Sequence, residues 1–182
     1  MTRIFTIRAD DIPHEGFHLT TVWDSSSLVD ILEAQTEPFT VSSPLELDIS
    51  FSRSGSKIIL EGSYTLQLQL SCARCLAEFP LPLAESFRYL LCPRSKDTSG
   101  KTGQGAGEDF EVVYYEGDHI DLRPLVREQI YLNMPGYPHC TENCKGLCPQ
   151  CGANLNEAPC SCAARSASSN ASPFSVLKKQ KH

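Results

Sequence analysis

The 182-residue chain has no long hydrophobic run, and its N-terminal residues lack the features of an export signal. No window approaches the ~20 consecutive apolar residues that a membrane helix requires. The opening stretch, MTRIFTIRADDIPHEG, has no basic flank followed by an apolar segment, as a secretory signal would. We therefore expect a cytoplasmic protein with no membrane partner, in a compartment where disulfides are rare.

The chain is also poor in positive charge. Its 16 Lys and Arg residues are outnumbered by 22 Asp and Glu residues, which gives a formal charge of −6 at pH 7. Proteins that hold nucleic acid through its phosphates usually present a basic face. Basic residues gather only in the C-terminal LKKQKH. Charge therefore gives no support to direct binding of nucleic acid, and it favours a cationic partner instead.

Cysteine, in contrast, is abundant and clustered. Of nine cysteines, six lie in the stretch HCTENCKGLCPQCGANLNEAPCSC, residues 139–162. An odd number leaves one thiol over in any scheme made only of disulfides. In the cytosol, clustered cysteines are more often metal ligands than disulfide partners. We therefore expect Zn²⁺, as one or two structural ions.

The spacing of the cysteines is typical of four-coordinate zinc. Two thiolates in a C-x₂-C unit can reach one ion at ~2.3 Å. CARC (72–75) and CPQC (148–151) are such units, and Gly146 and Gly152 beside the second permit the tight backbone it needs. The pairs C-x₃-C and C-x-C complete the candidate metal ligands, which are Cys72, Cys75, Cys140, Cys144, Cys148, Cys151, Cys160 and Cys162.

These eight cysteines divide most simply into two sets of four. One set is local, closed within fifteen residues, and contains Cys148, Cys151, Cys160 and Cys162. The other joins Cys72 and Cys75 to Cys140 and Cys144, and so ties the end of a long strand to the exit of a helix. A rival division joins Cys72 and Cys75 to Cys148 and Cys151. Spacing does not separate zinc from iron, because closed four-sulfur sites admit both. Cys92 is left over as a small apolar residue.

Catalysis finds little support in the sequence. A redox-active C-x-x-C would open a helix after a strand, whereas CARCLAEFPLPL continues as extended, proline-bearing sequence. Four-sulfur sites leave no open coordination position for a substrate. The chain carries no H-E-x-x-H, zinc-deaminase or Walker motif. We therefore expect no catalytic residues and no enzymatic activity.

Hydrophobic periodicity predicts an α+β fold with a mostly antiparallel β-sheet, two helices and a C-terminal cysteine-rich, zinc-binding appendage. Residues 45–51 and 64–72 alternate apolar and polar positions, as a half-buried hairpin does, and residues 78–91 are expected to return along the sheet. The prolines of that third strand favour an edge position. Helices are expected near 24–34, capped by Ser25–Ser27, and near 121–134, capped by Asp121.

Composition also divides the chain into parts. Residues 1–138 form the expected α+β core domain, with a disordered Gly- and Ser-rich loop near 95–109. Residues 139–162 form the cysteine-rich metal-binding segment. Residues 163–182 are expected to be a linker and a short C-terminal tail.

Four segments together resemble the YceD family, the large ribosomal RNA subunit accumulation proteins of bacteria and plastids. They are LSCARCLAEF, IDLRPLVREQIYLNMP, CKGLCPQCGANLNEAPCSC and PFSVLKK, in that order, within residues 45–180. The resemblance implies a non-enzymatic ribosome-biogenesis factor, needed for synthesis, processing or stability of large-subunit (23S) rRNA. It implies as partner a ribosomal protein, an rRNA-processing enzyme or a pre-ribosomal particle. Some members lack the second cysteine cluster, which implies two separable metal sites.

Two other functions stay open at this point. A zinc ribbon that binds RNA directly would need basic and aromatic residues around its cysteines. The stretch 139–162 offers one lysine, Lys145, and no aromatic residue. A thiol- or metal-dependent redox switch would use CARC as its reactive pair.

Overall fold

The computed structural model describes residues 5–34, 39–94 and 111–162. The chain forms two compact units, which we call the sheet unit (1–70 and 79–136) and the cysteine unit (71–78 and 137–182). Residues 71–78, expected within the core domain, thus group with the cysteine-rich segment, because Cys72 and Cys75 lie beside Cys140 and Cys144. The expected loop at 95–109 and the expected tail at 163–182 fall outside the described residues.

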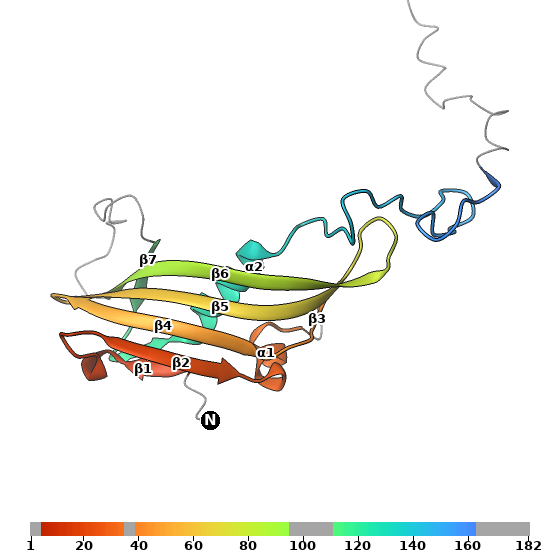
Figure 1. Cartoon of the computed structure of the whole chain (residues 1–182). Coiled ribbons are helices and arrows are strands. Elements are labelled where there is room, and N and C mark those ends of the chain that lie inside the picture. Colours follow the sequence, from red (N-terminus) through yellow and green to blue (C-terminus); the bar gives the residue numbers. More distant parts are fainter. Residues whose placement is uncertain (1–4, 35–38, 95–110, 163–182) are drawn as a thin grey trace, which may run out of the picture. The chain divides into compact units, whose positions relative to one another are not determined.

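The sheet unit is built on a mostly antiparallel β-sheet, which confirms the α+β fold (Figure 1). Neighbouring strands β2 and β4, β4 and β5, and β3 and β5 pair antiparallel, whereas β6 and β7 are parallel. In sheet order the described strands are β2 (Phe17–Trp23), β4 (Leu45–Ser54), β5 (Lys57–Ser71), β6 (Glu78–Pro93) and β7 (Glu111–Tyr115), with β3 (Phe39–Val41) paired to β5.

The hairpin of β4 and β5 follows the predicted alternation. In β4 every second side chain from Leu45 to Phe51 is buried, and in β5 the same holds from Tyr64 to Leu70. Gly55 begins the two-residue turn between the strands with a φ of +64°, a conformation that hairpin turns of this length require. One face of the sheet is therefore apolar and the other polar.

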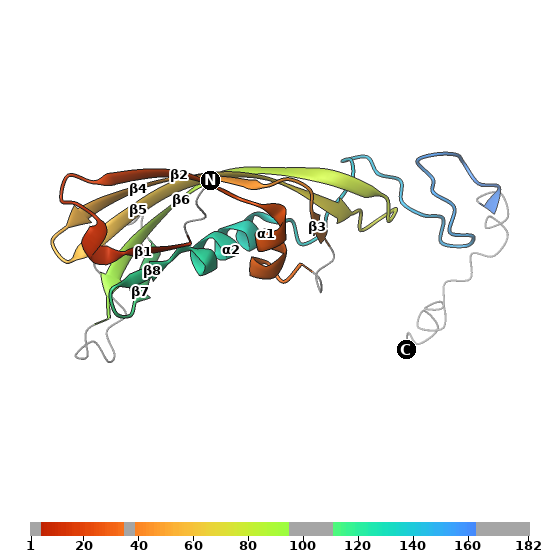
Figure 2. The same ribbon diagram turned by 90° about the horizontal axis from the view of Figure 1, so that it is seen from below.

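Both described α-helices lie on the same face of the sheet (Figure 2). Helix α2 (Leu122–Asn133) begins at Asp121, as predicted, and the carboxylate of Asp121 accepts a hydrogen bond from the backbone of Arg123. Helix α1 (Ser25–Ile31) is capped by Asp24 and not by the serines. The three serines already have helical backbone, so the capping position falls on Asp24, whose carboxylate accepts a hydrogen bond from the Ser27 amide.

Polar groups at the helix–sheet interface fix the position of α2. Gln129 lies on the face of α2 that meets the sheet. Its side-chain Nε2 donates to the hydroxyl of buried Tyr89 at 2.7 Å, and its backbone carbonyl accepts from the hydroxyl of Tyr64 at 3.2 Å. The hydroxyl of Tyr131, also in α2, donates to the carbonyl of Leu32 at the end of α1 at 2.7 Å. Buried hydroxyls need such partners, so these bonds orient α2 on the sheet.

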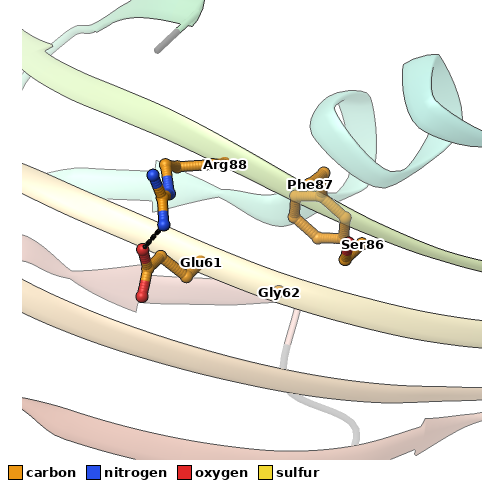
Figure 3. A pocket seen from close by; sticks show the side chains of 5 residues that line it. All are labelled: Glu61, Gly62, Ser86, Phe87 and Arg88. Carbon is orange, nitrogen blue, oxygen red and sulfur yellow. Dashed lines mark ion pairs between the residues drawn. The ribbon is translucent and has the colours of Figure 1, made fainter. Parts of the chain in front are cut away.

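Phe87 of β6 lies directly over Gly62 of β5 (Figure 3). A Cβ atom added at Gly62 would come within 2.5 Å of the Phe87 ring. Glycine is therefore the residue that allows this aromatic ring to cover the neighbouring strand. On the adjoining positions Arg88 and Glu61 form an ion pair at 2.7 Å.

The sheet unit also contains a short pair of strands outside the main sheet. Strands β1 (Thr6–Arg8) and β8 (His119–Asp121) form a separate antiparallel pair that the sequence did not predict, and a 3₁₀ helix, η1 (Ala9–Asp11), follows β1. The prolines of β6 favoured an edge position, but β6 does not lie at the edge along its whole length, because its residues Tyr89–Pro93 pair with β7.

Among the described residues, no helix is both long enough and apolar enough to cross a membrane.

Candidate metal centres

The cysteine unit contains two groups of four thiols. We call Cys72, Cys75, Cys140 and Cys144 cluster A, and Cys148, Cys151, Cys160 and Cys162 cluster B. Within each cluster all sulfur atoms lie within 4.8 Å of one another. This grouping is the first of the two divisions that spacing suggested, and the rival pairing of Cys72 and Cys75 with Cys148 and Cys151 is not formed. That the clusters hold metal stays a prediction.

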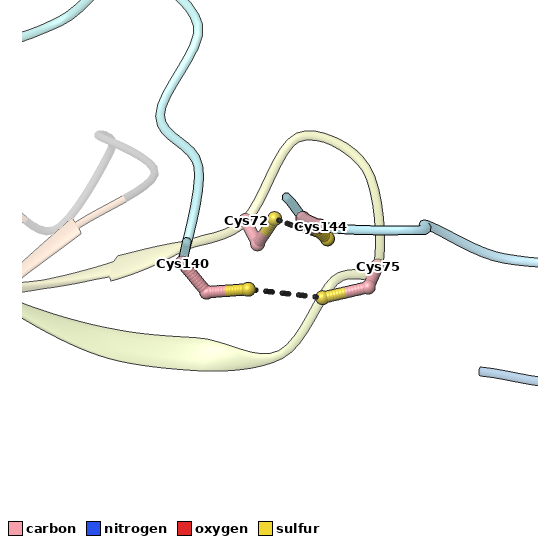
Figure 4. A group of neighbouring side chains, drawn as sticks. All are labelled: Cys72, Cys75, Cys140 and Cys144. Carbon is pink, nitrogen blue, oxygen red and sulfur yellow. Dashed lines mark hydrogen bonds between the residues drawn. The ribbon is translucent and has the colours of Figure 1, made fainter. Parts of the chain in front are cut away.

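The geometry of cluster A fits a tetrahedral ion. The sulfur atoms of Cys72 and Cys144 are 3.7 Å apart, and those of Cys75 and Cys140 are 3.6 Å apart (Figure 4). A tetrahedral zinc ion with bonds of ~2.3 Å separates its sulfur ligands by about 3.8 Å. A disulfide would bring two sulfur atoms to about 2.05 Å, and all nine cysteines are free thiols. The donor set and its spacing therefore suit zinc or iron.

The two C-x-x-C units share one backbone pattern. The Cys72 amide donates to the Ala77 carbonyl at 2.9 Å, and the Leu76 amide donates back to the Cys72 carbonyl at 2.9 Å. At the second unit, the Cys148 amide donates to the Ala153 carbonyl at 2.8 Å, and the amide four residues after Cys148 donates back at 2.9 Å. We call each of these turns a knuckle. The same turn thus presents two sulfur atoms to the centre of each cluster.

The residue after each knuckle's second cysteine has a left-handed backbone. Gly152 has a φ of +72°, as the sequence suggested from its glycine. Leu76 holds the same position in the first knuckle with a φ of +60°, although a Cβ atom disfavours this conformation. The side chain of Leu76 is 66% exposed, so burial does not offset the strain.

Backbone amides point at the first cysteine of each knuckle. Burial opposes ionisation of Cys72, but amide hydrogen bonds, including those from Cys140 and Cys75, lower its pKa to about 5. At the second knuckle the amides of Cys151 and Gln150 lower the pKa of Cys148 to about 6. Thiolate is the form that binds metal, so both knuckles favour the ligating state.

The two clusters differ in exposure. In cluster A, Cys72, Cys75 and Cys144 are buried and Cys140 is partly exposed. In cluster B only Cys148 is buried, and Cys151 is exposed. Neither cluster includes Cys92, which lies in β6 of the sheet unit, or the exposed His139. An ion in cluster A would be well shielded from solvent, and one in cluster B less so.

Two residues that the sequence did not single out contact a cluster A ligand. Asn156 donates through Nδ2 to the sulfur of Cys144 at 3.3 Å. Arg74 donates through Nη1 to the Cys144 carbonyl at 3.1 Å. Such outer partners orient metal ligands and hold their charge. The asparagines of GANLNE indicate a turn, because asparagine side chains bond nearby backbone in turns, but the sequence does not identify Cys144 as a partner of Asn156.

The fold and the two clusters together define a class of α+β proteins that carry two groups of four cysteine thiols able to hold metal in closed, four-sulfur sites. The chain belongs to the family described as large ribosomal RNA subunit accumulation protein YceD, whose model matches residues 60–181. The matched residues include both clusters, α2 and most of the two longest strands.

Several curated relatives match part of the chain, and one of them carries this family's description in its name. The chain is 24% identical over 158 residues to large ribosomal RNA subunit accumulation protein YCED homolog 1, chloroplastic, of Arabidopsis thaliana, which covers 75% of this chain and 49% of that protein. It is 33% identical over 87 residues to YlbN of Bacillus subtilis (47% and 46%), and 29% identical over 119 residues to Rv2926c of Mycobacterium tuberculosis (63% and 53%). The chain spans about half the length of the curated relatives it matches. No solved structure matches it.

Proposed function

We propose that this protein is a non-enzymatic ribosome-biogenesis factor that supports the accumulation of large-subunit (23S) rRNA in the cytoplasm. The observation that carries the proposal is the family match, which extends over both clusters and the main helix. A plant relative carries large-subunit rRNA accumulation in its name.

In this proposal Zn²⁺ has a structural role. Cluster A would be held by Cys72, Cys75, Cys140 and Cys144, and cluster B by Cys148, Cys151, Cys160 and Cys162. The ion in cluster A would cross-link segments distant in sequence, and the ion in cluster B would close a loop within fifteen residues. Neither ion would supply a reactive position, because four thiolates complete the coordination shell. Metal would thus hold residues 71–78 against residues 137–148 and shape a binding module.

Electrostatics favours a basic protein partner over naked RNA. The formal charge is −6, and four thiolates around one Zn²⁺ add −2 per cluster, so two loaded clusters give −6 − 4 = −10. A field of this sign speeds encounter with cationic proteins and repels phosphate. The partner would be a ribosomal protein, exposed on a pre-ribosomal particle, or an rRNA-processing enzyme.

Complementation tests the function and the role of the clusters together. In cells lacking their own copy, the ratio of 23S to 16S rRNA would be measured after expression of the wild-type chain or of Cys72→Ser/Cys140→Ser. We expect the wild-type chain to restore the ratio and the double variant to fail. Cys92→Ser is the matched control, because Cys92 lies outside both clusters, and it should restore the ratio. Failure of the wild-type chain to change 23S rRNA would contradict the proposal.

Co-purification tests the partner. The tagged chain should retain basic ribosomal proteins at low salt and release them as salt is raised, because screening weakens charge attraction. The same association should survive ribonuclease. Tight, salt-sensitive binding to purified 23S rRNA would instead favour the second candidate, a zinc ribbon that contacts RNA directly.

A further inference from the structure

A three-residue connector, Lys145, Gly146 and Leu147, joins the last ligand of cluster A to the first ligand of cluster B. It is held along its length by the loop between Cys151 and Cys160. The Lys145 amide donates to Asn156 Oδ1 at 2.8 Å, and the Leu155 amide donates to the Gly146 carbonyl at 2.9 Å. Leu147 forms a β-bridge with Asn154. The loop that cluster B closes is thus also the support for the connector.

Asn156 extends that support to a ligand of the other cluster. Its Nδ2 lies 3.3 Å from the sulfur of Cys144 in cluster A. Because its Oδ1 accepts from the Lys145 amide, the amide group is oriented with nitrogen toward the sulfur. A second bond from Nδ2 to Asn154 Oδ1 at 2.9 Å fixes this orientation.

We propose that metal binding at clusters A and B is positively coupled, and that Asn156 is the positioning residue that carries the coupling. This inference rests on the metal binding proposed above. An ion in cluster B ties Cys151 to Cys160 and Cys162, and so orders the loop that presents Asn156 to Cys144. Loading of cluster B therefore raises the affinity of cluster A.

The energetic basis is the hydrogen bond to a metal-bound thiolate. Nitrogen donors stabilise the negative charge of the sulfur and fix the direction of its lone pairs. Loss of such outer partners typically lowers metal affinity about 10–100-fold. Without an ion in cluster B, the loop must be ordered at the moment cluster A binds metal, which weakens binding. Linkage makes the effect reciprocal, so cluster A strengthens cluster B by the same factor.

Zinc titration of the purified, reduced full chain against a chromophoric chelator tests the coupling. Cluster B is disabled by Cys151→Ser/Cys162→Ser, which leaves every cluster A ligand in place. We expect the zinc affinity of cluster A to fall about 10-fold or more in this variant. Circular dichroism confirms that the sheet unit remains folded. Equal affinity of cluster A with and without cluster B would overturn the proposal.

Substitution of Asn156 tests whether this residue couples metal binding at the two clusters. Asn156→Asp keeps an oxygen for the Lys145 amide but has no N–H for the sulfur, so with cluster B intact it should lower the affinity of cluster A about 10–100-fold. With cluster B disabled the same substitution should have little further effect, because the loop no longer presents residue 156. An equal loss in both backgrounds would contradict coupling through Asn156.

Two variants serve as controls for this comparison. Gln150→Ala changes an exposed residue of the second knuckle and should leave the zinc affinity of cluster A unaltered. Arg74→Ala removes the side-chain hydrogen bond to the Cys144 carbonyl and should weaken cluster A equally in both backgrounds, because Arg74 lies outside the cluster B loop. A full chain that binds no zinc would refute the metal proposal itself. A full chain that binds two ions independently would refute only the coupling.

Discussion

Leu76 and Gly152 occupy equivalent positions in two turns of the same design, and only one of them is glycine. A left-handed backbone costs a residue with a Cβ atom about 1–2 kcal/mol relative to glycine. Since Leu76 is largely exposed, its side chain regains little of this through packing. The left-handed backbone at Leu76 therefore lowers the stability of the first knuckle relative to a knuckle with glycine at this position.

Leu76→Gly should raise the free energy of unfolding by about 0.5–1 kcal/mol, because relief of strain exceeds the added freedom of the unfolded chain. Denaturant unfolding of the metal-loaded chain measures the change. Gly152→Ala is the matched control: its Cβ meets no atom within 4 Å, so strain alone should lower stability by about 1 kcal/mol. A loss of stability in Leu76→Gly would show that its side chain makes contacts important to the fold.

The thiols of the two knuckles set the pH dependence of metal uptake. With pKa values of about 5 and 6, Cys72 and Cys148 are already thiolates at pH 7.5, whereas the pKa of Cys162, beside the Cys151 thiol, is raised to about 12. Only protonated thiols release a proton when metal binds. Each ion should therefore release fewer than four protons at pH 7.5, with more released as pH falls below about 6.

Calorimetric titration in two buffers of different ionisation enthalpy measures the number of protons released. Release of four protons per ion at pH 7.5 would contradict the lowered pKa values.

The same pKa shifts also make the stability of the metal-free chain depend on pH. A folded-state pKa below the unfolded value of about 9 means that the unfolded chain binds more protons between roughly pH 5 and 9. The metal-free chain should thus gain stability from Cys72 and Cys148 as pH rises through this window and lose it as pH falls.

At the scale of elements, strand periodicity was the most reliable signal. The alternation in β4 and β5 predicted both the hairpin and the face that packs inward, because one buried face requires a period of two. Strand β1 lies within RIFTIRA, which the sequence predicts as a short strand, but β8 and its pairing with β1 were missed, since β8 has only three residues and no periodicity shows over that length. Periodicity also predicted that Gln129 lies on the inward face of α2, but not its hydrogen bond to Tyr89, a partner from a distant strand.

The contact between Gly62 and Phe87 joins two long neighbouring strands, and it gives a prediction at this scale. Gly62→Ala should lower the free energy of unfolding by about 1–3 kcal/mol, because the new Cβ would overlap the Phe87 ring. Thermal unfolding measures the effect. Adding Phe87→Leu should recover part of the loss through relief of the overlap, despite the smaller buried side chain. If the double variant is no more stable than the sum of the single changes predicts, the ring is not the cause.

At the scale of the whole molecule, the sequence predicted which cysteines lie together but not what surrounds them. The four ligands of cluster B are close in the chain, so spacing alone groups them. Cluster A draws on two segments 65 residues or more apart, and spacing suggested it by elimination. The contact of Asn156 with Cys144 depends on the bridge between Leu147 and Asn154, which no periodicity encodes.

The account depends on two four-thiolate clusters that bind metal, and metal content measures this most directly. The full chain, purified under reducing conditions and analysed by mass spectrometry of bound elements, should carry two ions, and the cluster B variant Cys151→Ser/Cys162→Ser should carry one. A chelator should remove the ions and lower the unfolding temperature. A reduced chain with no bound metal, whose unfolding temperature is unchanged by the chelator, would contradict the account.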